Sequence, residues 1–62
     1  MGTDETALRP PALRRVDGNS LLRMYDAARA RAAAAVSPPA RAKADVAVGR
    51  IDDELRRRRI PH

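Results

Sequence analysis

The densest group of charged side chains is the stretch IDDELRRRR at residues 51–59, where three acids precede four arginines with only Leu55 between them. Carboxylates can ligate metals or transfer protons, and arginines bind phosphates. On a helix, however, the consecutive positions Asp52, Asp53 and Glu54 point in different directions, so they cannot converge on one metal ion. Each acid instead faces the arginine four residues later. The run therefore predicts a helix end whose charges are paired within the chain and favoured by the helix dipole.

The other groups that could do chemistry are few and poorly spaced. His62 is the only histidine, and at the end of the sequence we expect it to be mobile. Ser37 has the position of a helix cap and Tyr25 lies on an apolar helix face, so neither is predicted to be a nucleophile. There is no cysteine, no glycine-rich phosphate loop and no Glu-x-x-His pair. We expect no enzymatic activity, no catalytic residue, no metal, no cofactor and no small-molecule substrate.

The charge balance is basic, with 13 Lys and Arg against eight Asp and Glu and a formal charge of +5. Such a balance favours an acidic partner, and nucleic acid is one. Lys43, Arg50 and Arg57 recur every seven residues along one helix edge, about 10 Å apart. Together with Arg14 and Arg15 they are the candidate phosphate contacts, although a solvated helix flank has the same pattern. Without aromatic residues between the basic ones, base stacking is not predicted.

Two helices must position these groups. Asn19 or Ser20 is a suitable N-cap for a first helix over residues 20–35, which is almost entirely made of good helix formers. Pro38 disfavours helical backbone at the residue before it, so the first helix should end in a turn at residues 36–37. Ser37 can then cap a second helix with Pro38 in its first turn, running over residues 38–59.

The apolar positions of the two helices predict an antiparallel αα-hairpin. Within each helix they recur at steps of four, three and four residues, which is one helix face. Paired in reverse order, the residue numbers have a constant sum, so the four pairs meet at matched heights around the turn. The pairs are Leu21 with Leu55, Tyr25 with Ile51, Ala28 with Val48, and Ala32 with Ala44. Met24 lies beside this seam, which is also the candidate partner face.

Residues 1–19 are predicted to form an extended N-terminal arm. They contain Pro10-Pro11, which favours polyproline conformation, and Asp17-Gly18, which favours a turn. Leu8, Leu13 and Val16 could dock this arm on another surface, and a loosely ordered terminus is the alternative. Pro61 prevents extension of the second helix, so residues 60–62 are predicted to be a short tail.

The predicted fold is therefore all-α, a two-helix hairpin preceded by an extended proline-containing arm. A seam that is half alanine buries little apolar area for a 62-residue chain, so we expect assembly into a helical bundle. The first functional hypothesis is a non-enzymatic protein-interaction module that forms homo-oligomers or docks on a larger protein. The alternative is a small basic nucleic-acid-associated regulator of the plasmid, phage or antitoxin type. No apolar run reaches the ~20 residues of a membrane span, and we expect a cytoplasmic protein without membrane contact.

Overall fold

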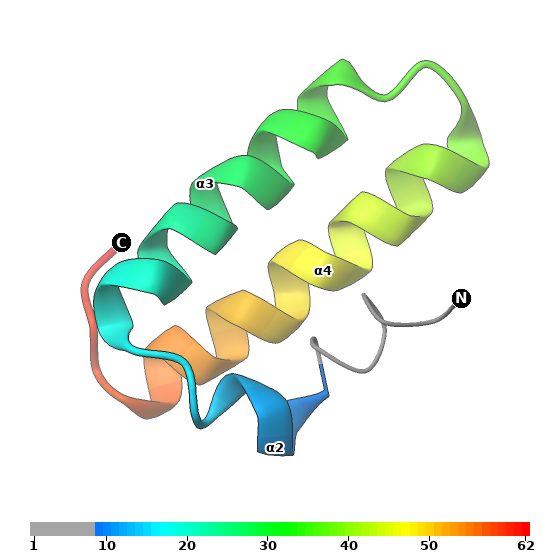
Figure 1. Ribbon diagram of the computed structural model, residues 1–62. Coiled ribbons are helices and arrows are strands. Elements are labelled where there is room, and N and C mark those ends of the chain that lie inside the picture. Colours follow the sequence, from blue (N-terminus) through cyan, green and yellow to red (C-terminus); the bar gives the residue numbers. More distant parts are fainter. Residues whose placement is uncertain (1–8) are drawn as a thin grey trace.

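The computed structural model describes residues 9–62 and contains three helices in that range, with no strand. They are α2 (Pro10–Leu13), α3 (Gly18–Ala34) and α4 (Pro38–Arg57). Helices α3 and α4 run antiparallel and pack along their length, and α2 crosses the end of the hairpin near the C-terminus of α4 (Figure 1). The predicted all-α hairpin is confirmed.

Helix α3 begins earlier than residue 20, because Asp17 is the N-cap in place of Asn19 or Ser20. The Asp17 carboxylate accepts a hydrogen bond from the backbone N–H of Ser20 at 3.0 Å and another from its hydroxyl at 2.7 Å. A carboxylate at this position satisfies unpaired N–H groups and also interacts favourably with the helix dipole. Asp17 was expected to be only part of a turn.

The turn between the helices follows the predicted chemistry. Ala35 and Ser37 both have extended backbone, and the Ser37 hydroxyl accepts a hydrogen bond from the N–H of Ala40 at 3.4 Å. Pro38 occupies the first helical turn, where an N–H would have no helical partner. Helix α3 ends at Ala34, so the connection is residues 35–37 and Val36 at its centre is fully exposed.

Helix α4 ends at Arg57, two residues before the predicted limit. Arg59 has a φ of 58°, and the N–H groups of Arg59 and Ile60 donate to the carbonyls of Arg56 and Leu55 at 3.0 and 2.9 Å. These two hydrogen bonds form a Schellman motif, which closes the helix with one left-handed residue. The motif turns Ile60 back onto the core, where it packs against the buried cluster.

The N-terminal segment differs from the extended arm that was expected. Pro10–Leu13 is one helical turn, with the N–H groups of Ala12 and Leu13 donating to the carbonyl of Arg9 at 3.0 Å. Two prolines are compatible with a first helical turn because that turn needs no N–H donor from them. Leu13 is buried and Val16 half-buried against the same core, whereas Leu8 lies outside the described residues.

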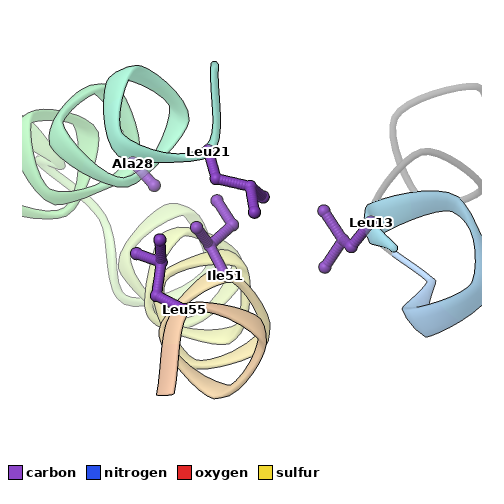
Figure 2. Packing of buried hydrophobic residues seen from close by; sticks show 5 residues of the cluster. All are labelled: Leu13, Leu21, Ala28, Ile51 and Leu55. Carbon is purple, nitrogen blue, oxygen red and sulfur yellow. The ribbon is translucent and has the colours of Figure 1, made fainter. Parts of the chain in front are cut away.

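The core lies at one end of the hairpin. Its buried members come from all three helices (Figure 2) and are Leu13, Leu21, Ala28, Ile51 and Leu55. Met24, Tyr25 and Val48 are half-buried and pack against it. Toward the turn the seam continues only with the half-buried alanines Ala32 and Ala44. The hairpin therefore has two halves. In the half nearer α2, which we call the closed half, Leu and Ile fill the space between the helices. In the half nearer the turn, which we call the open half, the seam consists of alanine.

Candidate interaction surface

The arginine run at the end of α4 is largely paired within the chain. Arg56 pairs with Asp52 at 2.9 Å, and Arg58 pairs with Glu54 at 2.7 Å, both four residues apart as predicted. Arg57 was predicted to pair with Asp53, but it does not. It binds Glu54 through two hydrogen bonds, of 3.1 and 2.6 Å.

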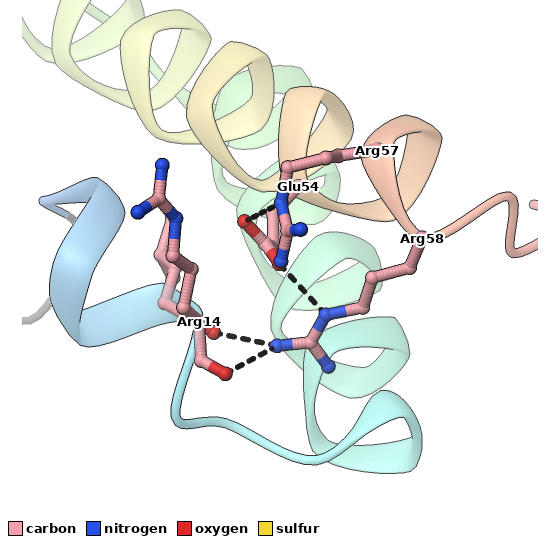
Figure 3. A network of polar contacts seen from close by, with 5 residues as sticks. Arg14, Glu54, Arg57 and Arg58 are labelled. Atoms are coloured by element: carbon pink, nitrogen blue, oxygen red, sulfur yellow. Dashed lines mark hydrogen bonds and ion pairs between the residues drawn. The ribbon is translucent and has the colours of Figure 1, made fainter.

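Glu54 differs from its two acidic neighbours because it is buried. Its side chain is 5% exposed and accepts hydrogen bonds from both Arg57 and Arg58 (Figure 3). Asp53, in contrast, is exposed. The two hydrogen bonds from Arg57, and then the one from Arg58, lower the pKa of Glu54 to about 2 although its burial acts in the opposite direction. Consecutive residues of a helix point in different directions, and of the three acids only Glu54 is buried.

Arg58 links this pair to the N-terminal segment. Its guanidinium donates to the carbonyls of Leu13 and Arg14 at 2.9 and 3.0 Å, while its Nε donates to Glu54 (Figure 3). Leu13 is the last residue of α2 and its carbonyl also accepts from the N–H of Val16 at 3.1 Å, while Arg14 directly follows the helix. Arg58 therefore holds the end of α2 against α4. This contact joins residues 44 or 45 positions apart, so the spacing of charges within α4 could not predict it.

The predicted phosphate contacts divide into two groups. Lys43, Arg50, Arg14 and Arg15 are exposed and make no ion pair with a described residue, whereas Arg57 is held by Glu54. A shallow hollow brings Arg14, Arg50 and Arg57 together, but two carboxylates lie in it as well. Its lining is Leu13, Arg14, Arg50, Asp53, Glu54 and Arg57. Its net charge is therefore small.

A second hollow lies between α3 and α4 in the half nearer the turn. Its volume is about 230 Å³ and its lining is Arg29, Ala32, Ala33, Arg41, Asp45 and Val48. Its apolar lining is Ala32, Ala33 and Val48, and no larger apolar side chain from residues 9–62 fills the space between the helices there. Arg29 comes from α3, and Arg41 and Asp45 come from α4. We call this surface the open groove.

His62 contacts both helices one helical turn beyond the open groove, since Tyr25 precedes Arg29 and Asp52 follows Val48 by four residues. The guanidinium of Arg29 lies over the ring of Tyr25, 5.7 Å from its centroid, and Tyr25 is one helical turn before Arg29 on α3. The His62 ring meets Tyr25 edge-on with 4.8 Å between centroids, and its Nε2 contacts the carboxylate of Asp52. The expectation that His62 is mobile is therefore wrong, because its side chain is only 12% exposed and has defined partners on both helices.

The outward face of α4 is small and smooth. Ala42, Val46 and Gly49 are all exposed on it, and Val46 keeps 52% of its surface accessible. A Cβ added at Gly49 would meet no other atom within 4 Å. Among residues 9–62 there is no group of three potential metal ligands. Within the same range, every helix is too short or too polar to span a lipid bilayer.

The two serine hydroxyls of the described segment have structural partners. Ser20 donates to Asp17 and Ser37 accepts from Ala40, so both serve helix N-termini. Comparison of the chain with known protein families, curated proteins and solved structures finds no significant match to any of them.

Proposed function

We propose that this chain is a non-catalytic, cytoplasmic protein-interaction module that docks an acidic segment of a larger protein in the open groove. The observation that carries the proposal is the division of the hairpin into two halves. The large aliphatic side chains of the predicted seam are buried inside the half nearer α2, so only the part of the seam nearer the turn is available to a partner. The open half offers Ala32, Ala33 and Val48 to a visiting side chain.

The charge of the open half defines the partner. Arg29 and Arg41 border the groove from opposite helices, and Arg31 and Lys43 lie close to them in sequence. Asp45 is the one acid between residues 29 and 47. A segment with carboxylates that flank one small aliphatic residue fits this arrangement, because the arginines meet opposite charge and the alanines meet apolar surface.

Site-directed photo-crosslinking in lysate of the native host tests the proposal. A photoreactive side chain replaces Ala33, which lines the groove, or Ala30, which is equally exposed on the outer side of α3. We expect a crosslinked protein at position 33 and none at position 30, and its crosslinked segment should be rich in Asp or Glu. Equal crosslinking at both positions would contradict the proposal, and a crosslink to a second copy of the chain would replace the larger partner by a homo-oligomer.

A charge-reversal pair tests the electrostatic part. Arg29→Glu with Arg41→Glu should abolish the crosslink at position 33. Arg23→Glu with Arg50→Glu changes the net charge equally on residues outside the groove and should leave it intact. Loss with both pairs would indicate a contribution of overall charge and not of the groove.

The nucleic-acid alternative is favoured by one observation, the exposure of Lys43, Arg50, Arg14 and Arg15, of which Arg14 and Arg50 line the same hollow. Four such contacts predict a slope of about −3.6 in a plot of log affinity for duplex DNA against log salt concentration. Titration of a labelled duplex by fluorescence anisotropy measures it. A slope near zero, or no binding at low salt, would exclude this alternative.

A further inference from the structure

We propose that His62 is a protonation-dependent latch, which closes one end of the groove between α3 and α4 when its imidazole carries two protons and opens it when one is lost. The inference rests on contacts within the chain and does not depend on the proposed function.

The hydrogen-bond partners of the ring favour the charged form. Nε2 of His62 contacts Asp52, and Nδ1 lies 2.9 Å from the carbonyl of Ile60, so both nitrogens face acceptors. An imidazolium ion donates from both nitrogens. A neutral imidazole has one proton, and in either tautomer its unprotonated nitrogen would face an oxygen lone pair. The geometry is therefore satisfied by one protonation state only.

The surroundings of the ring contain groups of both signs. On α4, Asp52 accepts from His62 and is itself paired with Arg56, whose charge opposes protonation of the imidazole. On α3, Tyr25 meets the ring edge-on and carries Arg29 over its own ring. The hydrogen bond to Asp52, and then the one to Ile60, raise the pKa of His62 above its usual 6.5 in spite of burial and Arg56.

Ile60 provides the fixed end of the latch. Its side chain packs on the core and approaches Gly18 so closely that a Cβ there would lie 3.2 Å from Ile60 Cδ1. Its N–H is also bonded to Leu55. Loss of the His62 contacts therefore releases Pro61 and His62 while Ile60 stays docked. Without the His62 side chain, the groove would extend past Arg29 and Val48 as far as Tyr25 and Asp52.

A pH titration of the whole chain by NMR tests the latch. We expect the carbon-bound ring protons of His62 to titrate with a midpoint above 6.5 and the Tyr25 ring resonances to move with the same midpoint. The nuclear Overhauser contacts between the two rings should be lost above it. Asp52→Asn should lower the midpoint to 6.5 or less, whereas Asp53→Asn, which changes an exposed neighbouring carboxylate, should leave it in place.

Two results would overturn the inference. One is a midpoint at or below 6.5 in the unaltered chain. The other is persistence of the Tyr25–His62 contacts above the midpoint, which would mean that the ring titrates without opening. His62→Phe retains a ring at this position without a titrating group, and the Tyr25 resonances of this variant should be independent of pH between 5 and 9. Circular dichroism of each variant verifies that the helices remain folded.

Discussion

At the scale of single residues, Glu54 and Arg59 have roles that their neighbours in the charged run do not share. Glu54 is buried and joins Arg57 and Arg58, while Asp53 beside it is exposed. Arg59 is the one non-glycine residue with positive φ in the described segment. The run is therefore not a uniform basic tail, and substitutions within it should have opposite effects on stability.

Glu54→Gln should destabilise the fold by about 1–3 kcal/mol, because a buried amide cannot replace the charge-assisted hydrogen bonds from both arginines. Urea unfolding followed by circular dichroism measures the change. Asp53→Asn is the matched control and should change the free energy of unfolding by less than about 0.5 kcal/mol. Equal effects of the two substitutions would contradict the structural role of Glu54.

Arg59→Gly should stabilise the fold by about 1 kcal/mol, because glycine adopts the left-handed conformation without the steric cost of a Cβ. Arg59→Ala removes the same charge and retains the Cβ, so it should give no comparable gain. For a domain of this size, 1 kcal/mol corresponds to an increase of roughly 4–8 °C in Tm. A similar gain from both variants would attribute the effect to charge and not to backbone conformation.

At the scale of elements, the short helix α2 is part of the hairpin and not a separate arm. Leu13 inserts into the core and Arg58 holds the carbonyls that follow it. A single helical turn has no stability of its own in water, so its conformation depends on these tertiary contacts.

Leu13→Ala should therefore cost about 2–4 kcal/mol of unfolding free energy, because it leaves a cavity in the core. Val46→Ala removes apolar atoms from a half-exposed position on α4 and serves as the control, with an expected change below about 0.5 kcal/mol. Chemical denaturation measures both. A Leu13→Ala variant as stable as the parent would show that α2 is not docked in solution.

At the scale of the whole molecule, charge pairing and the small core determine stability. The pKa values of three carboxyl groups are lowered in the folded chain. The largest cause is a hydrogen bond from Ser20 for Asp17, from His62 for Asp52 and from Arg57 for Glu54. The pKa of His62 is raised. The carboxylates therefore stabilise the fold at neutral pH and the histidine stabilises it on the acidic side of neutrality.

The directions of these pKa shifts predict that the fold is most stable at mildly acidic pH. A lowered carboxyl pKa contributes stability above about 4.5, the ordinary value for Glu, and loses it as the pH falls toward 2. The raised His62 pKa contributes fully below 6.5 and is lost as the pH rises through the folded value. Urea midpoints at pH 2.5, 5.5 and 8.5 should thus be highest at 5.5. His62→Gln should reduce only the loss of stability between pH 5.5 and 8.5. Glu54→Gln should reduce the loss of stability between pH 5.5 and 2.5.

Five buried apolar side chains among residues 9–62 are a small core, and the expected assembly into a helical bundle stays a prediction. Light scattering across a hundredfold range of concentration measures it, with a mass above that of the 6.8 kDa chain expected at the upper end. A folded monomer throughout would contradict assembly and leave docking on a larger partner as the source of additional burial.

The sequence by itself determined the hairpin, because helix periodicity and the Ser37-Pro38 junction are local properties that act within one or two turns. It also determined that two of the four terminal arginines pair four residues back, for the same reason. Tertiary structure decided how α2, Arg58 and His62 are placed, since they have partners far away in the sequence or on another helix, and it decided that Glu54 is buried. A proline pair fits both an extended arm and a first helical turn, and only the burial of Leu13 selects between them. Which side chain of a charged run is buried depends in the same way on what packs above it.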